Sequence, residues 1–189
     1  MAGWSHRCGR AAAAVAVVAL VALAMSAQEV RAANVLLQGY VLKAGGKLTE
    51  GAYELRMQSD CNLVLYKNGN KVLWASNTYR RGTGCYFTMQ TDGNAVVYTS
   101  ARKPVFATGT NGRNDGAHYI IMQGDGNLVM YNGSGRAIWA TFTNGLAFTN
   151  SQDEDGQQQQ LQQIPDGRES LRHALPGGVL ATPAELGQP

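Results

Sequence analysis

The chain has 189 residues, of which 15% are charged, and a formal net charge of +3 at pH 7. It has no stripe of clustered basic residues, which argues against nucleic-acid binding, and no His/Cys group with the spacing of a metal site. We therefore expect neither a metal nor any other cofactor.

Residues 1–32 have the pattern of a secretory signal peptide. Arg7 and Arg10 precede an unbroken apolar run from Ala11 to Met25, and small residues follow it. A run of this length is shorter than the roughly 20 residues that span a bilayer. Cleavage after Ala27 or after Ala32 fits equally well, and a signal anchor or a buried helix is the alternative. We expect a protein of the secretory pathway, extracellular or vacuolar.

Residues 33–149 form a body long enough for one domain. It has eleven basic and six acidic residues, a formal charge of +5, scattered singly except at Arg80-Arg81. Short runs rich in aliphatic and aromatic residues predict strands, and Gly- and Asn-rich turn signals separate them. The predicted strands are 35–37, 53–57, 63–66, 86–89, 95–98, 119–122 and 128–131. No stretch keeps a helical period, so the body is predicted to be all-β.

A ten-residue motif recurs three times in the body, beginning at Met57 (motif 1), Met89 (motif 2) and Met122 (motif 3). The glutamines of successive motifs are 32 and 33 residues apart, and a fixed period of this size marks a repeat architecture. Every second position holds Gln, Asp, Asn, Val and Tyr. These residues are Gln58, Asp60, Asn62, Val64 and Tyr66; Gln90, Asp92, Asn94, Val96 and Tyr98; and Gln123, Asp125, Asn127, Val129 and Tyr131. Because most of what repeats is polar, the motif predicts a binding site built three times.

The Asp-Gly pairs of motifs 2 and 3 signal tight hairpin turns, so Gln is expected to end one strand and Asn-x-Val-x-Tyr to start the next. Since side chains alternate along a strand, Asn, Val and Tyr share a face, which we expect to be open to solvent. The residues between them point to the core: Leu63, Leu65, Ala95, Val97, Leu128 and Met130. Duplicated turn chemistry alone would explain Asp and Gly, but not the retained Gln and Tyr.

An aromatic residue stands eight positions after each motif Tyr: Trp74, Phe106 and Trp139. Each is followed by a small residue and, further on, by Thr. If three similar sheets pack around an axis, these rings converge on it, and aromatics of this size dominate the energetics of a small core. We expect them to form an aromatic core.

Cys61 and Cys85 are the two cysteines that remain once the leader is removed. An even number in a secreted chain indicates one disulfide, which would stabilise the fold by about 3.5 kcal/mol on the chain-entropy model. A cysteine nucleophile is the alternative. It is disfavoured because His118 is the only histidine of the body and nothing in the sequence puts it beside either sulfur.

Asn132-Gly133-Ser134 is an N-glycosylation sequon. It falls at a turn signal that follows the motif 3 tyrosine. Asn132 is therefore a candidate glycan attachment site, and the sequence does not decide whether it is used.

Residues 150–189 form a tail of different composition, with a run of glutamines at 157–160, four of the five prolines and no aromatic residue. Such a segment buries too little apolar surface to offset its ordering entropy. We expect it to be disordered or removed as a propeptide, with at most a transient helix over residues 161–175.

The triple motif with its trailing Trp-Ala resembles the monocot mannose-binding lectins of the snowdrop (bulb-lectin) type, over residues 34 to about 148. The resemblance implies a β-prism II fold of three four-stranded antiparallel sheets about a pseudo-threefold axis, with one sugar site in each sheet. It implies that Asp60 and Asn62 bind the axial O2 of mannose. In the same way Gln58 would bind O3, Tyr66 O4 and Val64 the carbon face, and the matching residues of motifs 2 and 3 would act alike.

The family pattern also fits a Cys61–Cys85 disulfide, and it implies homodimers or homotetramers that exchange the C-terminal strand, about residues 138–148. The chain departs from the pattern at two places. Phe106 stands where the family usually has a second Trp, and Ala95 replaces the Leu found at positions 63 and 128. Both departures lie away from the sugar face, so we expect an effect on stability more than on binding.

We therefore expect a secreted lectin that recognises clustered mannose on glycoproteins or cell surfaces, in plant defence, with many weak sites adding up to avidity. The alternative is a non-catalytic lectin-fold defence or storage protein that acts through protein contacts. A glycosidase needs two carboxyl groups roughly 5–9.5 Å apart, and each motif supplies one, so we expect no enzyme. We expect neither nucleic-acid binding nor membrane insertion.

Overall fold

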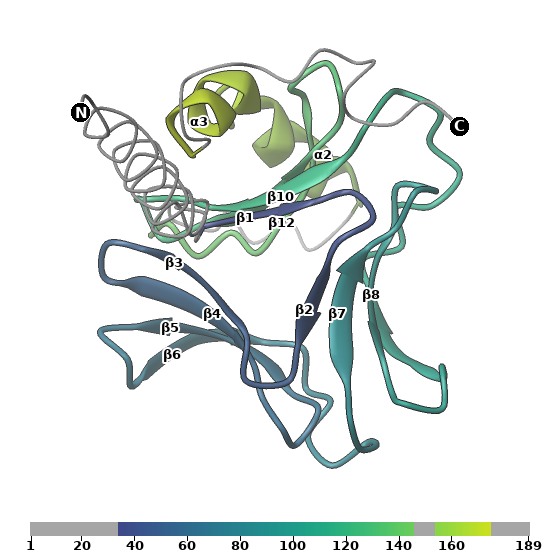
Figure 1. The fold of residues 1–189 in the computed structure, drawn as a ribbon. Coiled ribbons are helices and arrows are strands. Elements are labelled where there is room, and N and C mark those ends of the chain that lie inside the picture. Colours follow the sequence, from purple (N-terminus) through teal and green to yellow (C-terminus); the bar gives the residue numbers. More distant parts are fainter. Residues whose placement is uncertain (1–33, 146–153, 175–189) are drawn as a thin grey trace, which may run out of the picture. The chain divides into compact units, whose positions relative to one another are not determined.

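The computed structural model describes residues 34–145 and 154–174 (Figure 1). The signal peptide predicted for residues 1–32 lies outside the described residues. None of the helices in the described part of the chain is long and apolar enough to cross a membrane.

Three antiparallel sheets of four strands make up the body, each named here by the motif that it carries. Sheet I consists of β3 (Lys47–Glu50), β4 (Tyr53–Met57), β5 (Leu63–Lys67) and β6 (Lys71–Ala75). Sheet II consists of β2 (Val41–Lys43), β7 (Tyr86–Met89), β8 (Ala95–Tyr98) and β9 (Pro104–Ala107). Sheet III consists of β1 (Val35–Leu37), β10 (Tyr119–Met122), β11 (Leu128–Tyr131) and β12 (Ala137–Ala140). The prediction of an all-β fold of three four-stranded sheets is confirmed.

The N-terminal stretch of the body ties the sheets together. β1 pairs with β10, β2 with β7 and β3 with β4, so three consecutive short strands each enter a different sheet (Figure 1). The first strand thereby joins the sheet formed by the last ones. This closes the arrangement of three sheets and fixes the position of each motif relative to the core.

The inner faces of all three sheets contribute to one apolar core. The residues between the motif positions point into it, as predicted, and each is fully buried. Trp74, Phe106 and Trp139 meet pairwise in edge-on contacts, with ring centroids 5.5, 5.9 and 6.5 Å apart. Each ring is partly buried against the core, so these rings connect the three sheets.

The turn inside each motif uses a left-handed backbone conformation. Gly93 and Gly126 have φ of 83° and 92°, and Cys61 adopts the same conformation with φ of 74°. The Cys61 sulfur forms the predicted disulfide with Cys85. The polar pair Asp60 and Asn62 therefore keeps the turn geometry without a glycine between its members.

The C-terminal tail is helical where the structure describes it. It forms α2 (Glu154–Gln162) and α3 (Gly167–Ala174), whereas the sequence predicts disorder with at most a transient helix over residues 161–175. Leu161, Leu171 and Ala174 are buried in one apolar cluster with residues of sheet III. The tail alone has too little apolar surface to fold, but the sheet supplies the missing contacts and offsets the ordering entropy. Removal of the tail as a propeptide stays a prediction.

Candidate functional site

Each motif folds into a hairpin that brings its first and last residues together. The Gln side-chain nitrogen donates to the Tyr hydroxyl at 2.7 Å in motif 1, 3.1 Å in motif 2 and 2.7 Å in motif 3. A β-bulge immediately before each Tyr shifts the register against the following strand, and such bulges re-aim side chains. Residues eight positions apart thus become neighbours in all three sheets.

The Asp of each motif closes the turn. Its Oδ1 accepts a hydrogen bond from the backbone nitrogen of the motif Asn, at 2.9 Å for Asp60, 3.0 Å for Asp92 and 2.9 Å for Asp125. This contact holds the carboxylate at a fixed place beside the Asn. The second carboxylate oxygen, Oδ2, has lone pairs that can accept from a ligand.

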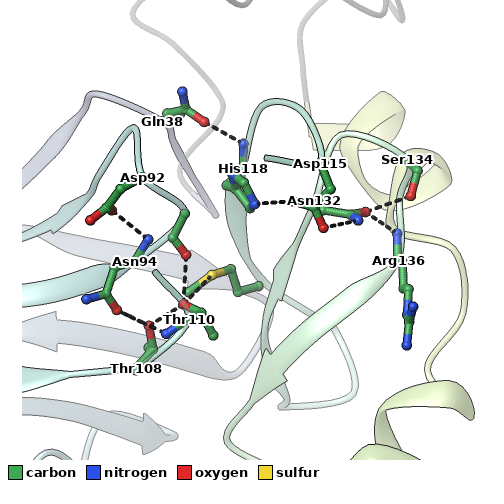
Figure 2. A network of polar contacts seen from close by, with 12 residues as sticks. Gln38, Asp92, Asn94, Thr108, Thr110, Asp115, His118, Asn132, Ser134 and Arg136 are labelled. Atoms are coloured by element: carbon green, nitrogen blue, oxygen red, sulfur yellow. Dashed lines mark hydrogen bonds and ion pairs between the residues drawn. The ribbon is translucent and has the colours of Figure 1, made fainter. Parts of the chain in front are cut away.

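The Asn side chain is held by its carbonyl oxygen. Asn94 Oδ1 accepts from the Thr108 hydroxyl at 3.0 Å and from the Thr110 backbone nitrogen at 3.3 Å (Figure 2). Asn62 and Asn127 make the corresponding contacts in their own sheets. Among the described residues, the hydrogen bonds made by these side chains all use Oδ1. The amide nitrogen Nδ2 makes none of these hydrogen bonds, so its N–H groups can donate to a ligand.

Sequence reasoning missed the residues that orient the Asn. They are a pair of hydroxyl residues two positions apart on the strand after the motif: Ser76 and Thr78, Thr108 and Thr110, and Thr141 and Thr143. The hydroxyls of each pair lie 2.7 or 2.8 Å apart. The second hydroxyl also donates to the backbone carbonyl of the motif turn at 2.6 or 2.7 Å. The signal was present, because the Thr after each core aromatic recurs in all three copies.

The prediction that the motif face is open to solvent is wrong in two respects. Val64, Val96 and Val129 are only 3%, 2% and 0% exposed, because each is flanked by a strand on either side. In motif 3 the Asn and the Tyr are closed off as well, although Gln123 is half-buried and Asp125 is exposed. Tyr131 is 0% and Asn127 1% exposed, whereas Tyr66, Tyr98, Asn62 and Asn94 are half-buried.

The three tyrosines have different neighbours across the sheet. The Arg56 guanidinium lies over the Tyr66 ring, 5.0 Å from its centroid. Tyr98 stacks on Tyr86 at 5.8 Å, and Tyr131 on Tyr119 at 5.5 Å. Burial raises the pKa of both Tyr119 and Tyr131 well above its usual range, so these hydroxyls stay protonated at any physiological pH.

A surface hollow of about 540 Å³ lies over motif 2. Gln90 and Tyr98 line it, together with Tyr86, Thr88 and Arg102. The hollow is large enough for a sugar ring. It places the paired Gln and Tyr of motif 2 where a ligand can reach them.

The predicted sequon lies in a polar cluster beside motif 3 (Figure 2). Asn132 is 4% exposed, and its amide nitrogen donates to Asp115 at 2.7 Å. The other Asp115 oxygen lies 2.9 Å from His118 Nε2. A glycan attached to that amide nitrogen would break the contact with Asp115, so the folded structure argues against use of the site.

Known proteins resemble this chain in sequence and in structure, although no protein-family model matches it. A crystal structure of monomeric monocot mannose-binding lectins from Gastrodia elata shares 49% identity at a TM-score of 0.56, over 59% of this chain and 98% of that one. The mannose-specific agglutinin from snowdrop (Galanthus nivalis) bulbs, in complex with methyl-α-D-mannoside, shares 44% identity at a TM-score of 0.51. That match covers 58% of this chain and 96% of the snowdrop chain.

Among curated proteins, mannose-specific lectin 1 of Colocasia esculenta is 50% identical over 56 residues, which are 30% of this chain. The matched segments cover 20% to 35% of the length of the first curated relatives. The solved structures are matched over nearly their whole length, and their sheets correspond to the three sheets described above.

Proposed function

Since the chain belongs to the monocot mannose-binding (bulb-type) lectin family, we propose that it binds mannose through the hairpins of its repeated motif. The observation that carries this proposal is the identical hydrogen-bonded arrangement of Gln, Asp, Asn and Tyr in three separate sheets. Packing alone would require apolar residues to repeat, not four polar ones held by side-chain contacts.

Each motif supplies donors and acceptors that suit neighbouring hydroxyls of a pyranose. The Asp Oδ2 accepts, the Asn Nδ2 donates, and the Tyr hydroxyl, which accepts from Gln, still has its own proton to donate. In the assignment by family resemblance, Asp and Asn hold the axial O2, Gln holds O3 and Tyr holds O4. A sugar with an equatorial O2 would leave the Asp–Asn pair unmatched, and an unpaired site group discriminates strongly.

The chain is a lectin and not an enzyme, since it belongs to a non-catalytic family. Each motif contributes a single carboxylate, whereas glycoside hydrolysis uses two acting on the same bond. Binding is therefore the whole chemistry of the motif. We propose that the protein enters the secretory pathway and recognises clustered mannose on glycoproteins or cell surfaces, in plant defence.

Oligomerisation belongs to the same proposal. A single shallow site binds a monosaccharide weakly, and several sites on one assembly multiply the affinity for clustered sugars. β12 pairs with β11 of its own chain in the structure. A dimer or tetramer with exchanged C-terminal strands would replace this pairing by the same pairing between two chains.

Retention on immobilised mannose tests the proposed function. We expect the full chain to be retained and to elute with methyl α-mannoside but not with methyl α-galactoside. The double variant Asn62→Asp/Asn94→Asp keeps the acceptor oxygen of each Asn but loses the donor, so it should be retained far more weakly than the unaltered chain. The matched control Asn70→Asp/Asn111→Asp changes two exposed turn residues and should be retained. Passage of the unaltered chain, with its disulfide intact, would refute the proposal and favour a role through protein contacts.

A further inference from the structure

The outer face of sheet III is apolar, unlike the outer faces of the other two sheets. Ile121 lies beside Val129 of motif 3, where Arg56 and Thr88 lie beside the corresponding valines of motifs 1 and 2. Across the next strand pair, Ile121 faces Val35, whereas Arg56 faces Lys47 and Thr88 faces Val41, so sheet III alone has an apolar residue at all three of these positions. One of three similar sheets thus has a surface suited to contact with protein.

The C-terminal tail covers this apolar face. Leu161 of α2 and Leu171 and Ala174 of α3 are buried in a cluster with Val35, Tyr119, Ile121, Val129 and Tyr131. α2 lies against β12, and Figure 1 draws both tail helices beside sheet III. The backbone nitrogen of Gly167 donates to the carbonyl oxygen of Gly135 at 3.0 Å, which anchors the start of α3 to the β11–β12 hairpin.

The tail lies directly on the motif 3 tyrosine. A Cβ placed on Gly167 would come within 2.5 Å of the Tyr131 ring, so the glycine backbone itself rests against the ring. Asn127 Nδ2, whose counterparts are the proposed sugar donors of motifs 1 and 2, is buried and has no hydrogen-bond partner in the described part of the chain. A donor left unpaired in a closed site is costly, and a ligand hydroxyl would satisfy it.

We propose that the tail is a lid on motif 3: with α2 and α3 docked, the chain offers two open sugar sites, and release of the tail opens a third. This inference rests on the proposed function. The occupant of the apolar face is the chain's own segment 154–174, because Leu161, Leu171 and Ala174 are buried against that face.

A titration with methyl α-mannoside, followed by NMR at the side-chain amides of Asn62, Asn94 and Asn127, tests the lid. In the full chain we expect the amide signals of Asn62 and Asn94 to shift as sugar is added. The affinity reported by Asn127 should be at least tenfold weaker, because apparent affinity falls in proportion to the fraction of molecules in which the site is open. Leu171→Asp puts a charge into the buried cluster and should undock α3. Asn127 should then respond at the concentrations that saturate the other two.

Gln163→Asp is the matched control, because it adds the same charge at an exposed tail position and should leave motif 3 closed. Hydrogen exchange at the Gly167 amide reports docking independently of sugar and should become at least tenfold faster in Leu171→Asp. If that amide stays protected, Gly167→Glu is added, for which there is no room beside Tyr131. A tail that remains docked through both changes contradicts the lid.

Three further results would overturn the lid. Asn127 could respond in the unaltered chain with the affinity of the other motifs, or stay silent once the tail is undocked. The undocked chain could also form a dimer through the exposed face, seen by sedimentation, without gaining a sugar site. Silence of all three motifs would instead count against the proposed function, so the two failures are distinguishable.

Discussion

At the scale of single residues, the motif Asn has two separate duties. Its carbonyl oxygen is tied to the hydroxyl pair and to backbone of the following strand, as Asn62 is to Ser76 and Thr78. Its amide nitrogen is the part proposed to meet the sugar. The two duties can be separated by substitution, because aspartate keeps the acceptor and loses the donor.

We predict that Asn62→Ala lowers the free energy of unfolding by about 1–3 kcal/mol, the cost of leaving partly buried groups without an acceptor. Asn62→Asp should stay close to the unaltered chain. Urea unfolding at neutral pH measures both. If the two variants were equally destabilised, the carbonyl contacts would not be the stabilising part of the residue.

Asp115 joins two elements through its two oxygens, since it contacts both His118 and Asn132. Burial acts to raise the pKa of Asp115, but the hydrogen bond from Asn132 and the nearby His118 outweigh it, so the pKa is lowered. Burial also acts to raise the pKa of Glu54, but Arg56 and Lys47 outweigh this effect, so the pKa of Glu54 is lowered as well. Both carboxyl groups have a lower pKa in the folded chain than in the unfolded chain. The stability that they contribute is therefore present at pH values above the unfolded-state pKa and is lost as the pH falls through the folded-state pKa.

We therefore predict that the unfolding free energy is constant near neutral pH and falls below about pH 4. Asp115→Asn should be less stable at pH 7, because an amide cannot accept from both partners. Its unfolding free energy should also fall less steeply in acid than that of the unaltered chain. Urea unfolding between pH 2 and pH 7 tests this. An identical pH dependence in the variant would show that Asp115 does not contribute to the acid transition.

At the scale of elements, the sequence predicts the central strands and misses the edges. All six central strands are among the predicted runs, because each buries one face in the core and contains mostly aliphatic or aromatic residues. Five of the six edge strands are absent from the predicted runs: β2, β3, β6, β9 and β12. For β12 only the family resemblance implied a strand, over about residues 138–148. Most of the missed strands are half-exposed and carry lysines or proline, as in Lys47–Glu50 and Pro104–Ala107. β12 is an exception, because it is mostly buried. Only pairing with the neighbouring strand identifies them.

The turn of motif 1 gives an element-scale prediction. Cys61 has a left-handed backbone, with φ of 74°, which costs a non-glycine residue about 1 kcal/mol. Removing the disulfide as Cys61→Ala/Cys85→Ala should lower stability by about 3 kcal/mol. Cys61→Gly/Cys85→Ala should recover about 1 kcal/mol of that loss in thermal or urea unfolding. A glycine variant no more stable than the alanine variant would argue that the turn relaxes without its disulfide.

At the scale of the whole molecule, function depends on how many motifs are open at once. The sequence predicts three equal sites, because each motif is complete. It does not predict that the tail covers one of them, since no local pattern pairs Leu161 and Leu171 with a sheet formed by earlier strands. The apolar residues Val35 and Ile121 are the sequence feature that indicates a covered face. They become informative only when the outer faces of the three sheets are compared.

Under the proposed function, two open sites on different sheets would let one chain bridge two glycans. We predict that Asn94→Asp, which removes one of them, reduces agglutination of mannan-coated particles by tenfold or more, because avidity multiplies site contributions. The affinity of motif 1 for free methyl α-mannoside should not change. Asn111→Asp is the control for the added charge. A loss of agglutination of only twofold would mean that the sites act independently.

Mannose binding by motifs 1 and 2 is tested most directly by a titration of the ¹⁵N-labelled full chain with methyl α-mannoside, followed at the side-chain amide signals of Asn62 and Asn94. We predict saturable shifts of both signals, at similar sugar concentrations, and none with methyl α-galactoside. If neither signal moved, or if both sugars moved them equally, the repeated polar hairpins would not be mannose sites.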